Sequence, residues 1–205
     1  MLPSMAVLAV AVLAIFSAER QLRALHVVTK PLATALLFLV VGWPRSRLGF
    51  WVDVGIGLSI VGDVALLWPG EGAFIVGLAA FLLAHVAYIV GFVSAAAWST
   101  WLALVVLATS QSTFFVLRAI WPKTTGLHAP VMAYGLAITA MVSAAFGTVV
   151  GPLPLGWMAA AGAVLFYASD ASLALNRFRR PIPHAAFLTL GLYWLGQIGI
   201  ALAAR

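Results

Sequence analysis

The chain has 205 residues, of which 64% are hydrophobic and only 8% are charged, and its mean hydropathy is +1.13. Soluble proteins carry about 25% charged residues, so this composition excludes a soluble globule, a disordered chain and a fibrous repeat, and predicts an integral membrane protein. The net charge of +6 does not indicate nucleic-acid binding, because the basic residues stand between apolar runs, where they act as topology signals.

A membrane-spanning helix needs about 20 mostly apolar residues. The chain divides into eight such runs, at residues 4–18, 27–43, 50–68, 74–95, 98–120, 130–150, 157–176 and 184–204. The residues before the first run carry no basic side chain, which a secretory signal peptide needs, so this run is expected to remain as a helix. No connection is long enough for a soluble domain. Residues 1–205 are therefore expected to form a single all-α transmembrane domain with eight helices.

The distribution of lysine and arginine predicts the topology. The connections after the odd-numbered runs hold Arg20, Arg23, Arg118, Lys123, Arg177, Arg179 and Arg180. The even-numbered connections and the C-terminus hold Arg45, Arg47 and Arg205. Basic residues are enriched in cytoplasmic loops. The odd-numbered connections are therefore expected in the cytoplasm and both termini outside, in what we expect to be a bacterial inner membrane.

Four charged residues lie inside the apolar runs, where each costs roughly 2.5–3.5 kcal/mol on insertion scales. Asp53 is near the outer start of its helix, where a solvated carboxylate is favoured by the helix dipole. Lys30, Asp63 and Asp170, counted from the cytoplasmic helix ends at 1.5 Å per residue, share one depth. We expect these three side chains to form one site.

Two interpretations of this group remain open. Lys30 and one aspartate are sufficient for a structural ion pair that holds the bundle together. A single lysine cannot neutralise Asp63 and Asp170 together, however, so the second carboxyl is expected to carry a proton. One ionised and one protonated carboxyl are the parts of an acid/base pair.

A weak internal similarity relates residues 60–66 to residues 167–173, at an offset of four helices. It suggests a parallel 4+4 helix repeat, as in several membrane folds. Buried carboxylates and such a repeat would also serve a small-molecule or proton-coupled transporter, which is the alternative function. The position of the charged group toward one face, rather than at the midplane, favours an enzyme.

Further polar side chains lie at depth and share helix faces by their spacing. They are candidates for substrate binding or for hydrogen bonds between helices: His85, Tyr88, Tyr134, Ser169, Tyr193 and Gln197. No metal or cofactor is expected, because the chain has no cysteine and no HExxH motif. A metal held by His85, Asp63 and Asp170 is the alternative if their helices converge.

Several motifs together, in order and spacing, resemble the YhhN-like lysoplasmalogenase family of multi-pass membrane proteins. They are Lys30-Pro31-Leu32, Gly62-Asp63, Phe74-x-x-Gly77-x-x-x-Phe81-x-x-x-His85-x-x-Tyr88, Tyr134, Met141, Ser169-Asp170-x-x-Leu173-Ala174-x-x-Arg177-Phe178 and Tyr193-x-x-x-Gln197. The resemblance implies eight crossings and hydrolysis of the vinyl ether bond of a lysoplasmalogen, a lysophospholipid with an ethanolamine or choline headgroup. It also implies that Asp63 and Asp170 are the active-site pair.

The reaction fits two carboxyl groups. Protonation of the β-carbon of a vinyl ether gives an oxocarbenium ion, which a carboxylic acid can bring about and a neighbouring carboxylate can stabilise. Basic side chains on the cytoplasmic side are placed to meet the lipid phosphate, or else they only set the topology: Lys30, Arg177, Arg179 and Arg180.

Overall fold

The structure is a computed structural model that describes residues 2–43 and 46–205. Outside the described residues lie Met1, Pro44 and Arg45. Arg45 is one of the basic residues counted above for the topology. The described residues form α1 (Leu2–Glu19), α2 (Arg23–Ala35), α3 (Leu37–Val41), α4 (Arg47–Ala65), α5 (Glu71–Val93), α6 (Leu102–Ile120), the 3-10 helix η1 (Trp121–Lys123), α7 (His128–Val150), α8 (Gly156–Phe178) and α9 (Ala185–Ala203). Eight segments are long and apolar enough to cross a membrane, with α2 and α3 together forming one of them. The predicted all-α, eight-span architecture is confirmed.

The second span is broken, which the sequence did not predict. The run 27–43 was expected to be one helix, but α2 and α3 are separated by Leu36. There the amide of Leu39 donates to the carbonyl of Leu36, three residues back, at 3.0 Å, as in a 3-10 turn. Because α2 begins at Arg23, Lys30 lies two turns from the helix start rather than one.

The third span also differs from its predicted bounds. α4 ends at Ala65, so Asp63 lies two residues from the helix end rather than the five expected from the run 50–68. α4 begins at Arg47, which places Asp53 in the second turn, where it is half-buried. The effect of the helix dipole falls off within the first turn. The interpretation of Asp53 as a solvated helix-start carboxylate is therefore wrong.

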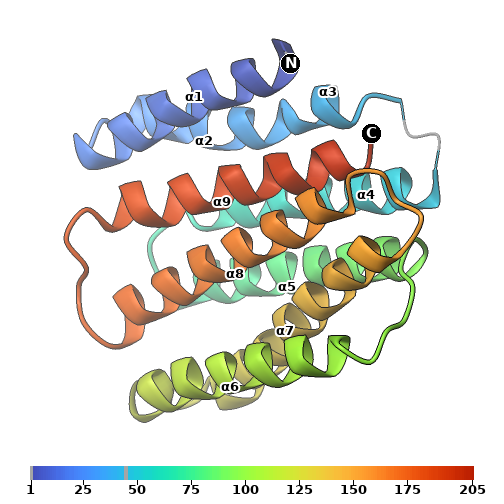
Figure 1. The fold of residues 1–205 in the computed structure, drawn as a ribbon. Helices are drawn as coiled ribbons and strands as arrows, with labels where there is room; N and C mark the ends of the chain where they lie inside the picture. The colour runs from blue at the N-terminus through green and yellow to red at the C-terminus, as the bar shows by residue number, and fades with distance from the viewer. Residues whose placement is uncertain (1, 44–45) are drawn as a thin grey trace.

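Figure 1 shows the helices lying side by side with their connections gathered at two ends. The connections α1–α2, α4–α5, α6–α7 and α8–α9 lie at one end, on the left of the view, and the connections α5–α6 and α7–α8, the start of α1 and the C-terminus lie at the other. We call the first of these the basic end, because the seven basic residues counted above lie in its connections or in the helix turns next to them. A contact across it joins the end of α1 to the α8–α9 connection: His184 Nδ1 lies 3.0 Å from Glu19 Oε2.

The closest helix pairs are α8 with α9 and α4 with α5, while α6 lies at the periphery against α7 and, less extensively, α8 (Figure 1). Glycines allow α8 and α9 to approach. A Cβ atom on Gly162 would lie 2.6 Å from the carbonyl oxygen of Gly196, and one on Gly196 would lie 2.8 Å from that of Gly162. Small residues at such crossings let membrane helices pack backbone to backbone.

Replacing Gly162 by alanine is expected to destabilise the bundle, because the added methyl group forces α8 and α9 apart. Overpacking of this kind costs about 1–3 kcal/mol, so the midpoint of thermal unfolding in detergent should fall by several degrees. Gly57→Ala is the matched control, since no atom lies within 4 Å of a Cβ built on Gly57. Equal unfolding midpoints for the two variants would contradict this account.

Candidate active site

The carboxylate of Asp63 is enclosed by side chains from α2 and α9. Lys30 Nζ lies 3.5 Å from Asp63 Oδ1. The Thr34 hydroxyl donates to Asp63 Oδ2 at 2.6 Å, and the Tyr193 hydroxyl donates to the same oxygen at 2.9 Å. Only 2% of the Asp63 side chain is exposed. Three groups of the protein therefore hold this carboxylate in a single orientation.

Thr34 is a member of this cluster that the sequence analysis missed. Its hydroxyl oxygen bonds to Asp63, lies 3.3 Å from the Tyr193 hydroxyl and accepts a hydrogen bond from Trp194 Nε1 at 3.2 Å. A signal was present, because Thr34 follows Lys30 by four residues and so shares its helix face. Threonine is common in membrane helices, so the spacing alone did not single it out.

Asp170 has different partners, from α5 and α7. The Tyr134 hydroxyl donates to Asp170 Oδ2 at 2.5 Å, and His85 Nε2 lies 3.6 Å from the same oxygen. His85 Nδ1 lies 2.6 Å from the carbonyl oxygen of Phe81. Because a carbonyl only accepts, Nδ1 carries the hydrogen. In the neutral ring Nε2 is then an acceptor, and it has no hydrogen-bond partner among the described residues.

Aromatic rings lie between the Asp63 and Asp170 clusters. The ring centroid of Phe166 is 5.3 Å from that of Tyr193 on one side and 4.9 Å from that of His85 on the other. The Phe81 ring lies 5.8 Å from that of Tyr193. Lys30, expected to share one site with both aspartates, pairs with Asp63. The count of residues gave depth along each helix but not rotation about its axis, and rotation decides which side chains meet.

An apolar cavity lies among α5, α6, α7 and α8, and we call it the tail cavity. Its lining includes Phe74, Leu78, Phe81, Val116, Leu117, Ile120, Ile138, Tyr134 and Asp170. Asp63 is not part of this lining. The Asp170 side chain is 15% exposed, against 2% for Asp63. Asp170 is therefore the aspartate that a molecule in the tail cavity would meet.

Three of the expected substrate-binding residues have protein partners away from the tail cavity. The Tyr88 hydroxyl donates to Gln197 Oε1 at 2.7 Å, and Gln197 Nε2 donates to Ser59 Oγ at 3.1 Å. The Ser169 hydroxyl donates to the carbonyl of Thr189 at 2.8 Å. These bonds connect α4, α5, α8 and α9. None of the three lines the tail cavity, and a role in substrate binding stays a prediction for each.

The alternative of a shared metal has no geometric support in the part of the chain that the structure describes. Within residues 2–43 and 46–205 no group of three or more His, Asp or Glu side chains is placed to hold a metal ion. His85 and Asp170 are neighbours, while Asp63 is turned toward Lys30.

The YhhN family model matches residues 25–204, which contain both aspartates and all their partners described above. The chain belongs to the YhhN family. Among its relatives is the human protein named "Lysoplasmalogenase TMEM86B", 36% identical over 165 residues that cover 79% of this chain and 68% of the relative. Human "Lysoplasmalogenase TMEM86A" is 30% identical over 179 residues, covering 84% of this chain and 71% of the relative. A Mycobacterium tuberculosis protein named "Lysoplasmalogenase" is 35% identical over 153 residues, covering 72% and 57%. No solved structure matches the chain.

Lys30→Met is expected to destabilise the protein by about 3–5 kcal/mol, because it leaves the Asp63 carboxylate buried without its cation. The double variant Lys30→Met/Asp63→Asn should recover part of this loss, since the amide carries no charge. Thermal unfolding in detergent measures both effects. The exposed Lys123, whose ammonium donates to the backbone carbonyl of Arg179 at the basic end, supplies the control Lys123→Met. A double variant no more stable than Lys30→Met would contradict the ion pair.

Proposed function

We propose that this YhhN-family protein hydrolyses the vinyl ether bond of lysoplasmalogens inside the membrane. The observation that carries the proposal is the carboxyl of Asp170, bonded by Tyr134, on the wall of an apolar cavity. The names of the relatives support the same reaction. The substrate is a single-chain lipid with an ethanolamine or choline headgroup, and its tail would occupy the tail cavity.

The reaction consumes one water and releases two products. A proton adds to the β-carbon of the vinyl ether, and the neighbouring carbon and the ether oxygen share the positive charge. Water attacks that carbon and loses a proton, which gives a hemiacetal. Collapse of the hemiacetal breaks the carbon–oxygen bond, so that a fatty aldehyde and a glycerophospho-alcohol leave. The difficult step is the first, for which general acid catalysis contributes about 10²–10⁴-fold.

In the proposed mechanism Asp170 is the acid. Its carboxyl gives the proton to the β-carbon, and Tyr134 holds the carboxyl through Oδ2. The resulting carboxylate faces the oxocarbenium ion and stabilises it, as carboxylates do in glycoside hydrolysis. We assign the base to His85, whose Nε2 is an acceptor 3.6 Å from Asp170 Oδ2. His85 is buried behind the tail cavity lining, so in this mechanism the attacking water must enter beside Asp170 to reach it.

We propose that Asp63 acts through its neighbours rather than on the substrate. It binds Tyr193, whose ring packs against Phe81, and Phe81 lines the tail cavity. Asp63 is then a positioning residue for the cavity wall. The paired acid/base mechanism expected from the sequence instead gives both aspartates a direct role, and the two mechanisms differ in their kinetic consequences.

Asp170→Asn is expected to reduce kcat by a factor of about 10²–10⁴ without loss of folding, since the amide cannot supply the proton. Asp63→Asn should lower kcat less and lower the unfolding midpoint. Aldehyde released from a lysoplasmenyl lipid by purified protein, followed by mass spectrometry, measures the rates. The control is Asp53→Asn, which makes the same chemical change on α4, ten residues before Asp63.

Equal loss of kcat in Asp63→Asn and Asp170→Asn, with both proteins fully stable, would restore the paired acid/base mechanism. Full activity in Asp170→Asn would overturn the assignment of the acid. The wild-type protein can also be tested for transport in proteoliposomes. If it carries the lipid across their membrane and releases no aldehyde, the result contradicts hydrolysis and favours the transporter.

We also propose that the basic end faces the cytoplasm of a bacterial inner membrane, because basic residues concentrate there. Alkaline phosphatase fused after Arg205 is then expected to be active, and the same enzyme inserted after Lys123 inactive. The reverse pattern of activities would invert the topology.

A further inference from the structure

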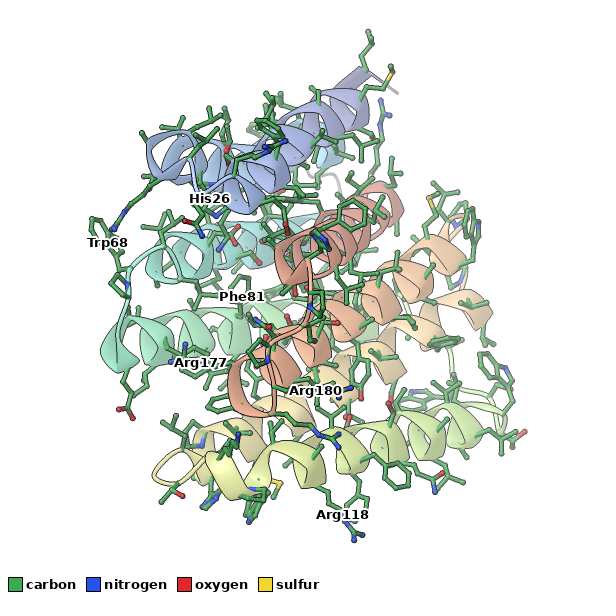
Figure 2. All side chains as sticks on the ribbon, turned by 90° about the vertical axis from the view of Figure 1, so that its left-hand side faces the viewer. His26, Trp68, Phe81, Arg118, Arg177 and Arg180 are labelled. Atoms are coloured by element: carbon green, nitrogen blue, oxygen red, sulfur yellow. The ribbon has the colours of Figure 1, made fainter. Side chains whose placement is uncertain are left out.

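A second cavity opens at the basic end and adjoins the tail cavity. Its lining comes from the start of α2, the α4–α5 connection, the start of α5 and the end of α8: Arg23, His26, Val27, Leu66, Leu67, Trp68, Pro69, Gly70, Phe74 and Arg177. Leu66 and Phe74 also line the tail cavity, so the two spaces meet at these side chains. Figure 2 views this end of the bundle, with His26, Trp68 and Arg177 labelled and Arg118 far from them, beside α6.

Aromatic rings hold the two arginines of this cavity. Arg177 Cζ lies 3.8 Å from the ring centroid of Phe74, and Arg23 Cζ lies 5.6 Å from that of Trp68. Such contacts orient a guanidinium over a ring face while its N–H groups stay available. The ion pairs among the described residues involve neither arginine. Two cations from helices far apart in sequence therefore converge on one cavity with their donors unused by a carboxylate.

The spacing along α8 fits a lysophospholipid. Arg177 follows Asp170 by seven residues, which is two turns and about 10 Å along the same helix face. In a lysoplasmalogen, seven bonds join the β-carbon of the vinyl ether to the phosphorus atom, about 8 Å when extended. With the β-carbon at the Asp170 carboxyl, the phosphate reaches the neighbourhood of the Arg177 guanidinium.

We propose that Arg23 and Arg177 bind the phosphodiester of the substrate, with the tail in the tail cavity and the headgroup alcohol toward water. Guanidinium groups bind phosphate oxygens through paired, charge-assisted hydrogen bonds. This assignment rests on the proposed function and names the subsite that recognises the lipid class. It also distinguishes Arg177 from the other basic residues considered for the phosphate. Arg179 and Arg180 do not line the cavity, and Lys30 is paired with Asp63.

The test measures binding, so that it does not depend on turnover. Purified wild type and the variants Arg23→Gln and Arg177→Gln are titrated with a 1-acyl lysophosphatidylethanolamine and with a monoacylglycerol of the same chain length, which lacks the phosphate. Each substitution is expected to weaken binding of the lysophospholipid about ten-fold or more and to leave binding of the monoacylglycerol unchanged. Arg180→Gln, an equal loss of charge three residues along the chain from Arg177, should change neither affinity beyond two-fold.

A kinetic arm uses lysoplasmenyl-ethanolamine. Both variants should raise KM with little change in kcat, because the phosphate lies away from the reacting carbon. If wild type binds the lysophospholipid as expected but releases no aldehyde, the proposed reaction fails and the phosphate subsite stands.

Three results would overturn the subsite. Unchanged lysophospholipid affinity in both Arg23→Gln and Arg177→Gln would show that these residues serve the topology alone. If Arg180→Gln weakens binding of the lysophospholipid as much as the two variants do, the effect comes from general surface charge and not from a subsite. Inorganic phosphate that binds wild type as tightly as the lysophospholipid would identify a site for free phosphate instead.

Discussion

The carboxylate of Asp63 lies inside an apolar bundle, and its partners must come from the protein because a buried, unpaired charge is very costly. Lys30 and Thr34 reach it from α2, and Tyr193 reaches it from α9. Three spans are thereby tied to one side chain. α9 in turn packs backbone to backbone on α8, the helix that carries Asp170. The Lys30–Asp63 ion pair is thereby linked, through α9, to the helix that carries Asp170.

Asp63 and Asp170 were both found as charged residues inside apolar runs, but their surroundings in the structure differ. Asp63 meets an ammonium group and two hydroxyls, whereas Asp170 meets a phenol, an imidazole and an apolar cavity. Differences of this kind are how enzymes give two carboxyls different tasks. They explain why we propose the proton-donating role for Asp170 and a positioning role for Asp63.

Much of the architecture could be predicted because the bilayer restricts it. Length and hydropathy predicted the eight spans, and the cost of intramembrane charge led to Asp63 and Asp170. Contacts between helices could not be predicted from the sequence, because counting residues does not give the rotation of a helix about its axis. The pairing of Tyr134 with Asp170 and the part played by Thr34 belong to this second class. The break at Leu36 lies within one apolar run, where hydropathy does not distinguish a continuous helix from a broken one. The parallel 4+4 repeat stays a prediction.

The peripheral position of α6 has a consequence for how a cleaved lipid would separate. α6 packs mainly against α7, yet its residues Val116, Leu117 and Ile120 form part of the tail cavity wall. Of the four helices around the cavity, α6 packs least extensively against the rest of the bundle, and its outer side chains are apolar and exposed, as expected of a surface that faces lipid. In the proposed reaction a fatty aldehyde, being uncharged, would have a route sideways into the bilayer, while the glycerophospho-alcohol would leave through the basic end into water. Each fragment then departs into the phase that dissolves it, and neither has to pass the other.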